Sequence, residues 1–164
     1  MSTSLEFIYY LLIALGVGAL VGIEREHHKG DDMVIAGVRT FPLVSVLGFL
    51  LAYIGQNSEE LVPGMSAQYL QALSLIGIGI VAVMAVGLLY IRFKMGVPGL
   101  TTPFALVLTY ISGLFVGFGM IIEAVVVSVV VTFLLVSKKR LHAYAELLDD
   151  HELIGALEFI AIAF

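Results

Sequence analysis

The chain has 164 residues, of which 60% are hydrophobic and only 13% are charged, with a mean hydropathy of +1.08. An ordinary soluble domain is about 45–50% apolar and about 25% charged, so this composition is typical of a membrane protein. The formal net charge is -5, and the absence of cysteine excludes disulfide and thiolate chemistry.

Five apolar runs follow one another along the chain, several of them close to the roughly 20 residues that a helix needs to cross a bilayer. They cover residues 5–23, 41–55, 69–91, 102–118 and 121–136. The first lacks the basic leader of a secretory signal, so it predicts a retained transmembrane helix. The fifth is rich in valine, but in lipid only a helix satisfies its own backbone hydrogen bonds. We therefore predict an all-α, polytopic membrane helix bundle of five transmembrane helices, with a tight hairpin at Gly119 and Met120.

The basic residues predict an orientation, because short loops rich in Lys and Arg stay in the cytoplasm. With the N-terminus outside, all eight basic residues fall on the inner side of the membrane. They are Arg25, Lys29, Arg39, Arg92, Lys94, Lys138, Lys139 and Arg140. We expect the N-terminus outside and the C-terminus in the cytoplasm.

The C-terminal part of the chain differs from the five apolar runs in charge and in length. Residues 137–152 carry charges and a stripe of apolar residues at helical spacing, which predicts a cytoplasmic amphipathic helix. Residues 153–164, LIGALEFIAIAF, would cover about 18 Å as a helix, too little to span a bilayer. We expect either a fragment cut inside a sixth helix or an interfacial helix with Glu158 facing water. The expected domains are thus residues 1–136, 137–152 and 153–164.

Polar residues gather at the inner ends of three predicted helices, and we expect them to form one site. They are Glu24, Arg25, Arg39, Thr40, Thr101 and Thr102. Thr40 and Thr102 are predicted N-caps, so two helix N-termini would direct partial positive charge at this region. We expect Glu24 to lie there and to pair with Arg39.

This inner site has two interpretations. It is either a vestibule for an ion or small molecule or a salt bridge that holds helix ends together, since ionisable residues at this depth pair whatever the function. Two helix N-termini and two arginines favour an anion over a bare divalent cation. Mg²⁺ prefers carboxylates, and a weak hydrated cation site could form from Glu24, Glu26, Asp31 and Asp32. The other interpretation of this charge run is a solvated loop.

Pairs of glycines four residues apart mark faces where helices can approach closely. Gly18 and Gly22 lie in the first predicted helix, and Gly113 and Gly117 lie in the fourth. We expect these four residues to pack within the bundle, with a dimer interface or a substrate path as the alternatives. The glycines of the third helix fit the same account, namely Gly77, Gly79 and Gly87.

Three short stretches in order carry a family resemblance: GALVGIERE, AGVRT and GLTT. Together they resemble the N-terminal membrane domain of the MgtC/SapB family, over roughly residues 10–136. The resemblance implies a small multi-pass protein of the prokaryotic cell (inner) membrane, associated with adaptation to magnesium limitation. Some relatives continue into further membrane helices after the fifth.

The predicted function is support of magnesium homeostasis, as a transport component or as a regulator. The alternatives are a structural or interaction module that regulates a partner, and a part of a larger transporter for an anion or small metabolite. Expected partners are the lipid bilayer and either another membrane protein or a second copy of the chain, with no nucleic acid. No nucleophile with a base and no phosphate loop is evident, so we expect no enzyme, no catalytic residue and no cofactor beyond Mg²⁺.

Overall fold

The computed structural model describes residues 2–27, 36–57, 64, 67–96, 99–147 and 159. Within these ranges the chain forms five helices and no strand, which confirms the all-α prediction for this part of the chain. The helices are α1 (Ser2–His27), α2 (Thr40–Gln56), α4 (Ala67–Lys94), α5 (Thr101–Gly117) and α6 (Ile121–Leu147).

Two of these helices are long and apolar enough to cross a membrane by themselves, over Ser4–His27 in α1 and Ala72–Lys94 in α4. The apolar parts of α2, α5 and α6 are shorter, at 17 residues or fewer. Five spans therefore remain a prediction, as does the orientation. The helix α6 continues without a break past residue 137, and residues 153–164 lie outside the described part except for Phe159, so the division into domains also stays a prediction.

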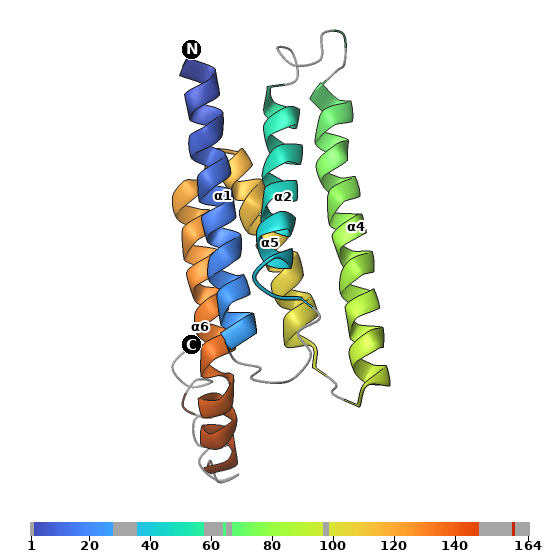
Figure 1. The fold of residues 1–164 in the computed structure, drawn as a ribbon, viewed down its shortest axis with the longest axis vertical. Coiled ribbons are helices and arrows are strands. Elements are labelled where there is room, and N and C mark those ends of the chain that lie inside the picture. The colour runs from blue at the N-terminus through green and yellow to red at the C-terminus, as the bar shows by residue number, and fades with distance from the viewer. Residues whose placement is uncertain are drawn as a thin grey trace.

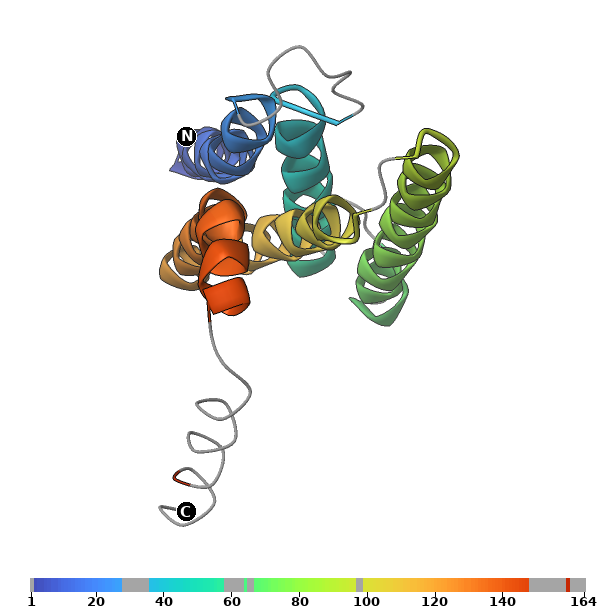
Figure 2. The same ribbon diagram turned by 90° about the horizontal axis from the view of Figure 1, so that it is seen from below.

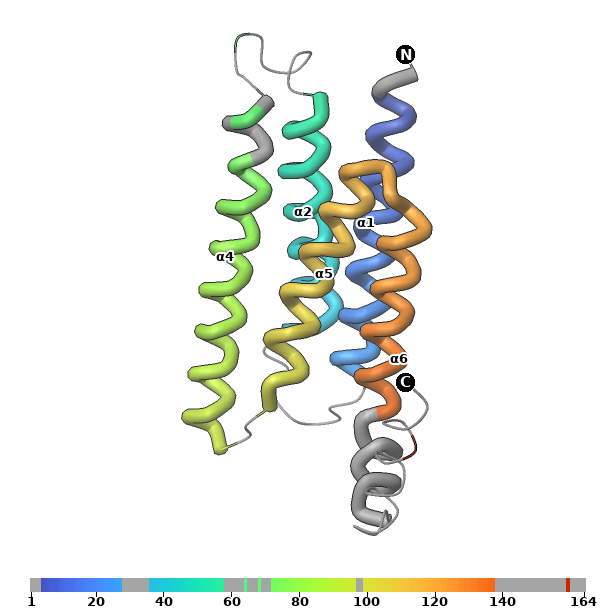
Figure 3. Tube along the Cα trace, turned by 180° about the vertical axis from the view of Figure 1, so that it is seen from behind, coloured from blue at the N-terminus to red at the C-terminus, as the bar shows by residue number. Residues whose placement is uncertain are grey.

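Successive helices run in alternate directions, so the C-terminal ends of α1, α4 and α6 share one end of the bundle with the N-terminal ends of α2 and α5 (Figure 1). The helix α5 packs against all four others, and α4 contacts only α2 and α5, so α4 lies at one side of the bundle (Figure 2). Seen from behind, α5 runs obliquely between α4 and α6 (Figure 3). Segments distant in sequence thus meet around α5.

The connection between α5 and α6 is a tight turn. Gly119 has a φ of +77°, in the left-handed region that glycine adopts without a steric penalty. The backbone N–H of Met120 donates to the carbonyl of Phe115 at 2.8 Å, which closes the end of α5. The predicted hairpin at this position is confirmed.

Glycines bring the backbones of neighbouring helices into direct contact. A Cβ atom at Gly113 would overlap the carbonyl oxygen of Ser45, and one at Gly117 would lie 2.7 Å from the carbonyl oxygen of Phe49, so α5 lies against the backbone of α2. On α1, a Cβ atom at Gly18 would lie 2.6 Å from the Cα of Pro42. The corresponding distance for Gly22 is 3.0 Å, to the Cα of Val38. Any larger side chain here would push helices apart.

Of the three glycines of α4, one lies against a neighbouring helix and two do not. A Cβ atom at Gly77 would collide with the hydroxyl of Tyr110, whereas Gly79 and Gly87 have nothing within 4 Å of a built Cβ. The packing expected of Gly79 and Gly87 was therefore wrong, because α4 touches its neighbours along one narrow face only. Tyr110 is fully buried and donates to the carbonyl of Ser74 at 2.8 Å, a hydrogen bond that joins α5 to α4.

Candidate functional site

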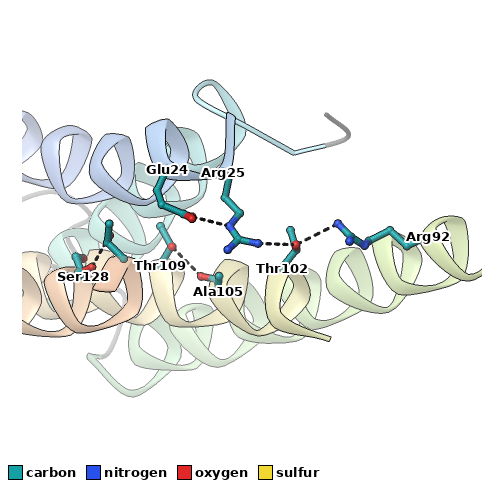
Figure 4. Close-up of polar contacts among 8 residues, drawn as sticks. Glu24, Arg25, Arg92, Thr102, Ala105, Thr109 and Ser128 are labelled. Carbon is teal, nitrogen blue, oxygen red and sulfur yellow. Dashed lines mark hydrogen bonds and ion pairs between the residues drawn. The ribbon is translucent and has the colours of Figure 1, made fainter. Parts of the chain in front are cut away.

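The last turns of α1 place an acid and a base side by side in a buried position. Glu24 is 6% exposed and Arg25 is 9% exposed, although both lie near the end of the helix. The Nε atom of Arg25 donates to Oε2 of Glu24 at 2.9 Å, an ion pair between adjacent residues (Figure 4). The pair turns the guanidinium of Arg25 towards the start of α5.

Thr102, in the first turn of α5, is the point where three helices meet through side chains. Its hydroxyl oxygen is buried and accepts a hydrogen bond from Nη1 of Arg25 at 3.1 Å. The same oxygen accepts a second hydrogen bond from Nη1 of Arg92 at 3.2 Å. The two guanidinium groups approach Thr102 from opposite sides, one from α1 and one from α4 (Figure 4). One hydroxyl therefore joins α1, α4 and α5.

Arg92 is the residue of this site that the sequence did not identify. It is 9% exposed, and its Nε atom has no hydrogen-bond partner within the described part of the chain. Gly99, just before α5, allows the guanidinium to lie close to the backbone, because a Cβ atom there would be only 3.2 Å from Nη2 of Arg92. In the sequence Arg92 indicated only the membrane orientation, since its approach to Thr102 depends on how α4 packs against α5.

The structure corrects two expectations about this region. Glu24 pairs with the adjacent Arg25, and Arg39, its expected partner, is exposed. The residues at the N-cap positions of α2 and α5 are Arg39 and Leu100, both with αR backbone angles and no side-chain cap bond. Thr40 and Thr102 are therefore helical residues and not N-caps. The helices begin one or two residues earlier than expected, and this places the Thr102 hydroxyl where both arginines reach it.

The remaining residues of the predicted inner site are less enclosed. Thr40 is half-buried and Thr101 is exposed. Of the residues proposed for a cation site, Glu26 is exposed and accepts the backbone N–H of Val38 at 3.0 Å, while Asp31 and Asp32 lie outside the described residues. Across the ranges that the structure covers, no group of three or more His, Asp or Glu side chains is arranged to hold a metal ion.

The buried polar cluster has an excess of positive charge. Among the described residues it contains two guanidinium groups, of Arg25 and Arg92, and the carboxylate of Glu24. Removing a charged group from water is costly unless an opposite charge and hydrogen bonds compensate it. The N-terminus of α5, next to Thr102, adds partial positive charge from its first backbone N–H groups. The electrostatics of the cluster therefore favour a negatively charged group.

Comparison with known proteins gives one match. The model of the MgtC family matches residues 11–144, which include Glu24, Arg25, Arg92 and Thr102. No curated protein and no solved structure matches the chain.

Proposed function

Because the chain belongs to the MgtC family, whose members are membrane proteins linked to magnesium homeostasis and virulence adaptation, we propose that it supports adaptation to low magnesium as a regulator. In this proposal it acts on another membrane protein, has no enzymatic activity and does not itself carry Mg²⁺ across the membrane. The match covers the whole of the helical bundle except the first residues of α1 and the last residues of α6.

The charge of the buried cluster is the observation that supports regulation over Mg²⁺ transport. With Glu24 paired to Arg25, the guanidinium of Arg92 has no ion-pair partner among the described residues. A divalent cation about 4 Å from one such guanidinium would be repelled by about 8 kcal/mol at an effective dielectric constant of about 20. Because Mg²⁺ also prefers carboxylate oxygens, this end of the bundle is unfavourable to it.

The proposed arrangement in the cell membrane has five spans, with the N-terminus outside. It is supported by the alternating helix directions, which place the last turns of α1 and α4 at one shared end of the bundle (Figure 1). These turns carry Arg25, Arg92 and Lys94. Loops rich in such residues stay in the cytoplasm. The buried cluster would then lie at the level of the inner membrane surface, and another membrane protein or a second copy of the chain can contact the end of the bundle that contains it.

Two measurements on the same protein test the proposal. The first is Mg²⁺ entry into liposomes that contain the purified protein and a trapped Mg²⁺ indicator, and the second is growth at low Mg²⁺ of a strain lacking its own family member. We expect restored growth and no entry above that of empty liposomes. Arg92→Gln should lose the growth effect, whereas Lys94→Gln, an exposed basic residue two positions away, should keep it. Mg²⁺ entry that depends on the protein would contradict regulation and favour transport.

A further inference from the structure

We propose that Arg25, Arg92 and Thr102 form a binding site for a phosphate group, supplied either by a lipid headgroup or by inorganic phosphate. This inference goes beyond the regulatory function proposed above and does not depend on it. It begins with Arg92, whose side chain is buried at the end of α4 and whose Nε atom has no hydrogen-bond partner among the described residues.

The contacts of Arg92 do not neutralise it. Its one hydrogen bond to a described residue goes to the uncharged hydroxyl of Thr102, and that oxygen also accepts from Arg25. A hydroxyl oxygen has two lone pairs, so both are used and the O–H of Thr102 is left to donate. The Nε–H group of Arg92 and the O–H group of Thr102 have no acceptor among the described residues. An acceptor that carries negative charge would satisfy both.

The geometry around Thr102 suits a phosphate group, whose oxygen atoms can accept from several donors at once. Both guanidinium groups lie within hydrogen-bond distance of the same oxygen atom, so one anion can contact both (Figure 4). Guanidinium groups bind phosphate through paired N–H donors. Nη2 of Arg92 lies against Gly99, where a Cβ atom would be only 3.2 Å away, and the 17-residue helix α5 begins at this point without a side-chain cap. Backbone N–H groups at such a helix start favour phosphate.

The site lies at an end of the bundle that two sources of phosphate can reach. Arg25 lies two residues before the end of α1, and Arg92 lies two residues before the end of α4. Helix ends of this kind lie at the level of lipid headgroups in a membrane-spanning bundle. A lipid phosphate can therefore reach the site from the bilayer, and inorganic phosphate can reach it from the aqueous side.

Direct binding to the delipidated, detergent-solubilised full chain tests the proposal in two arms. The first measures radiolabelled inorganic phosphate by equilibrium dialysis. The second measures phosphatidylglycerol by native mass spectrometry, with diacylglycerol, which lacks the phosphate, as the lipid control. We expect saturable binding in at least one arm and no retained diacylglycerol. Binding in the first arm alone identifies inorganic phosphate as the source, and binding in the second alone identifies the lipid.

Matched variants show whether the bound group uses the proposed residues. Arg92→Gln should weaken binding at least about tenfold, the size expected for one lost hydrogen bond from a charged donor. Lys94→Gln removes the same charge from an exposed side chain two residues away and should change binding less than about twofold. Should Arg92→Gln not fold, Arg92→Lys and Thr102→Val give the same comparison. The proposal is overturned if neither probe binds saturably, or if binding is undiminished in these Arg92 and Thr102 variants.

Discussion

At the scale of single residues, two charged guanidinium groups of the buried cluster share one uncharged acceptor, the hydroxyl of Thr102. Thr102 lies 77 positions from Arg25 and 10 positions from Arg92 along the chain, and its hydroxyl holds both guanidinium groups within 3.2 Å. Glu24 supplies the negative charge, through Arg25. The charge balance of this pair depends on Glu24, because removing its carboxylate leaves the buried guanidinium of Arg25 without that compensation.

Replacing Glu24 by Gln tests this balance. The substitution removes the carboxylate that pairs with Arg25, so the free energy of unfolding should fall by about 3 kcal/mol, as for other buried pairs that lose one partner. Denaturation of the purified protein with increasing SDS, followed by circular dichroism, measures the change.

Glu26→Gln is the matched control for this substitution. Glu26 is exposed and, among the described residues, its carboxylate accepts from the backbone N–H of Val38, which a Gln oxygen can also do. Its unfolding free energy should change by less than about 1 kcal/mol. Equal losses in the two variants would show that the Glu24–Arg25 pair contributes no more than a surface charge. If phosphate binds as proposed, adding it should restore part of the stability of Glu24→Gln, and adding Mg²⁺ should not.

At the scale of helices, the bundle is organised by the contact between α2 and α5. Gly48 and Gly113 let the two backbones touch, and the built Cβ atoms of both would overlap carbonyl oxygens of the opposite helix. Without a hydrophobic driving force between helices in lipid, such close contact is a main source of helix association. By contrast α4 is attached along one narrow face.

Substitution of glycine by alanine should change the free energy of unfolding differently at the contact between α2 and α5 and on the exposed side of α4. Gly113→Ala forces α5 away from the backbone of α2 and should destabilise the protein by about 1–3 kcal/mol, the range for overpacked cores. Gly79→Ala adds the same methyl group to a helix at a place with nothing within 4 Å, and should be neutral or stabilising by up to about 1 kcal/mol. The same SDS titration compares them. Equal changes in the free energy of unfolding of the two variants would mean that α2 and α5 are not in backbone contact.

The hydrogen bond from the hydroxyl of Tyr110 to the carbonyl of Ser74 joins α5 to the N-terminal half of α4. Tyr110→Phe removes the hydroxyl but keeps the ring, so the expected cost is about 1 kcal/mol and a looser attachment of α4. Hydrogen exchange measured by mass spectrometry should rise in the N-terminal half of α4 and not in α2. Tyr90→Phe is the control, because Tyr90 is 68% exposed. Unchanged hydrogen exchange in α4 of Tyr110→Phe would mean that apolar packing alone holds α4 against the bundle.

The sequence predicted the helices well because apolar runs of bilayer length have few other structures available to them. The run expected at residues 102–118 corresponds to Thr101–Gly117, and that at 69–91 corresponds to Ala67–Lys94. The helices continue past the apolar runs, as α1 does through Glu24 and Arg25, since hydropathy reports lipid contact and not where backbone hydrogen bonding ends. Side-chain partners were less predictable. The pairing of Arg92 with Thr102 depends on the approach of two helices, which no local pattern encodes.

At the scale of the whole molecule, the absence of cysteine makes the membrane orientation directly testable. Single cysteines can replace Gln56, exposed at the end of α2, and Lys94, exposed at the end of α4. With the N-terminus outside, a membrane-impermeant maleimide should label Gln56→Cys in intact cells and Lys94→Cys only after the cells are permeabilised. The cysteine-free parent chain is the control. The reverse pattern would place the arginine cluster on the outer surface and contradict the proposed orientation.

The tight turn at Gly119 has a consequence for the membrane itself. The 17 residues of α5 rise about 25 Å, less than the about 30 Å of a bilayer's hydrocarbon core, and α6 starts again only a few residues later. In the five-span arrangement, the exposed backbone of this turn must meet headgroups or water, so the outer leaflet has to thin beside it. Lipids with shorter acyl chains would relieve this mismatch. The protein should therefore gather in thinner regions of a mixed bilayer, with α5 and α6 setting its preferred thickness.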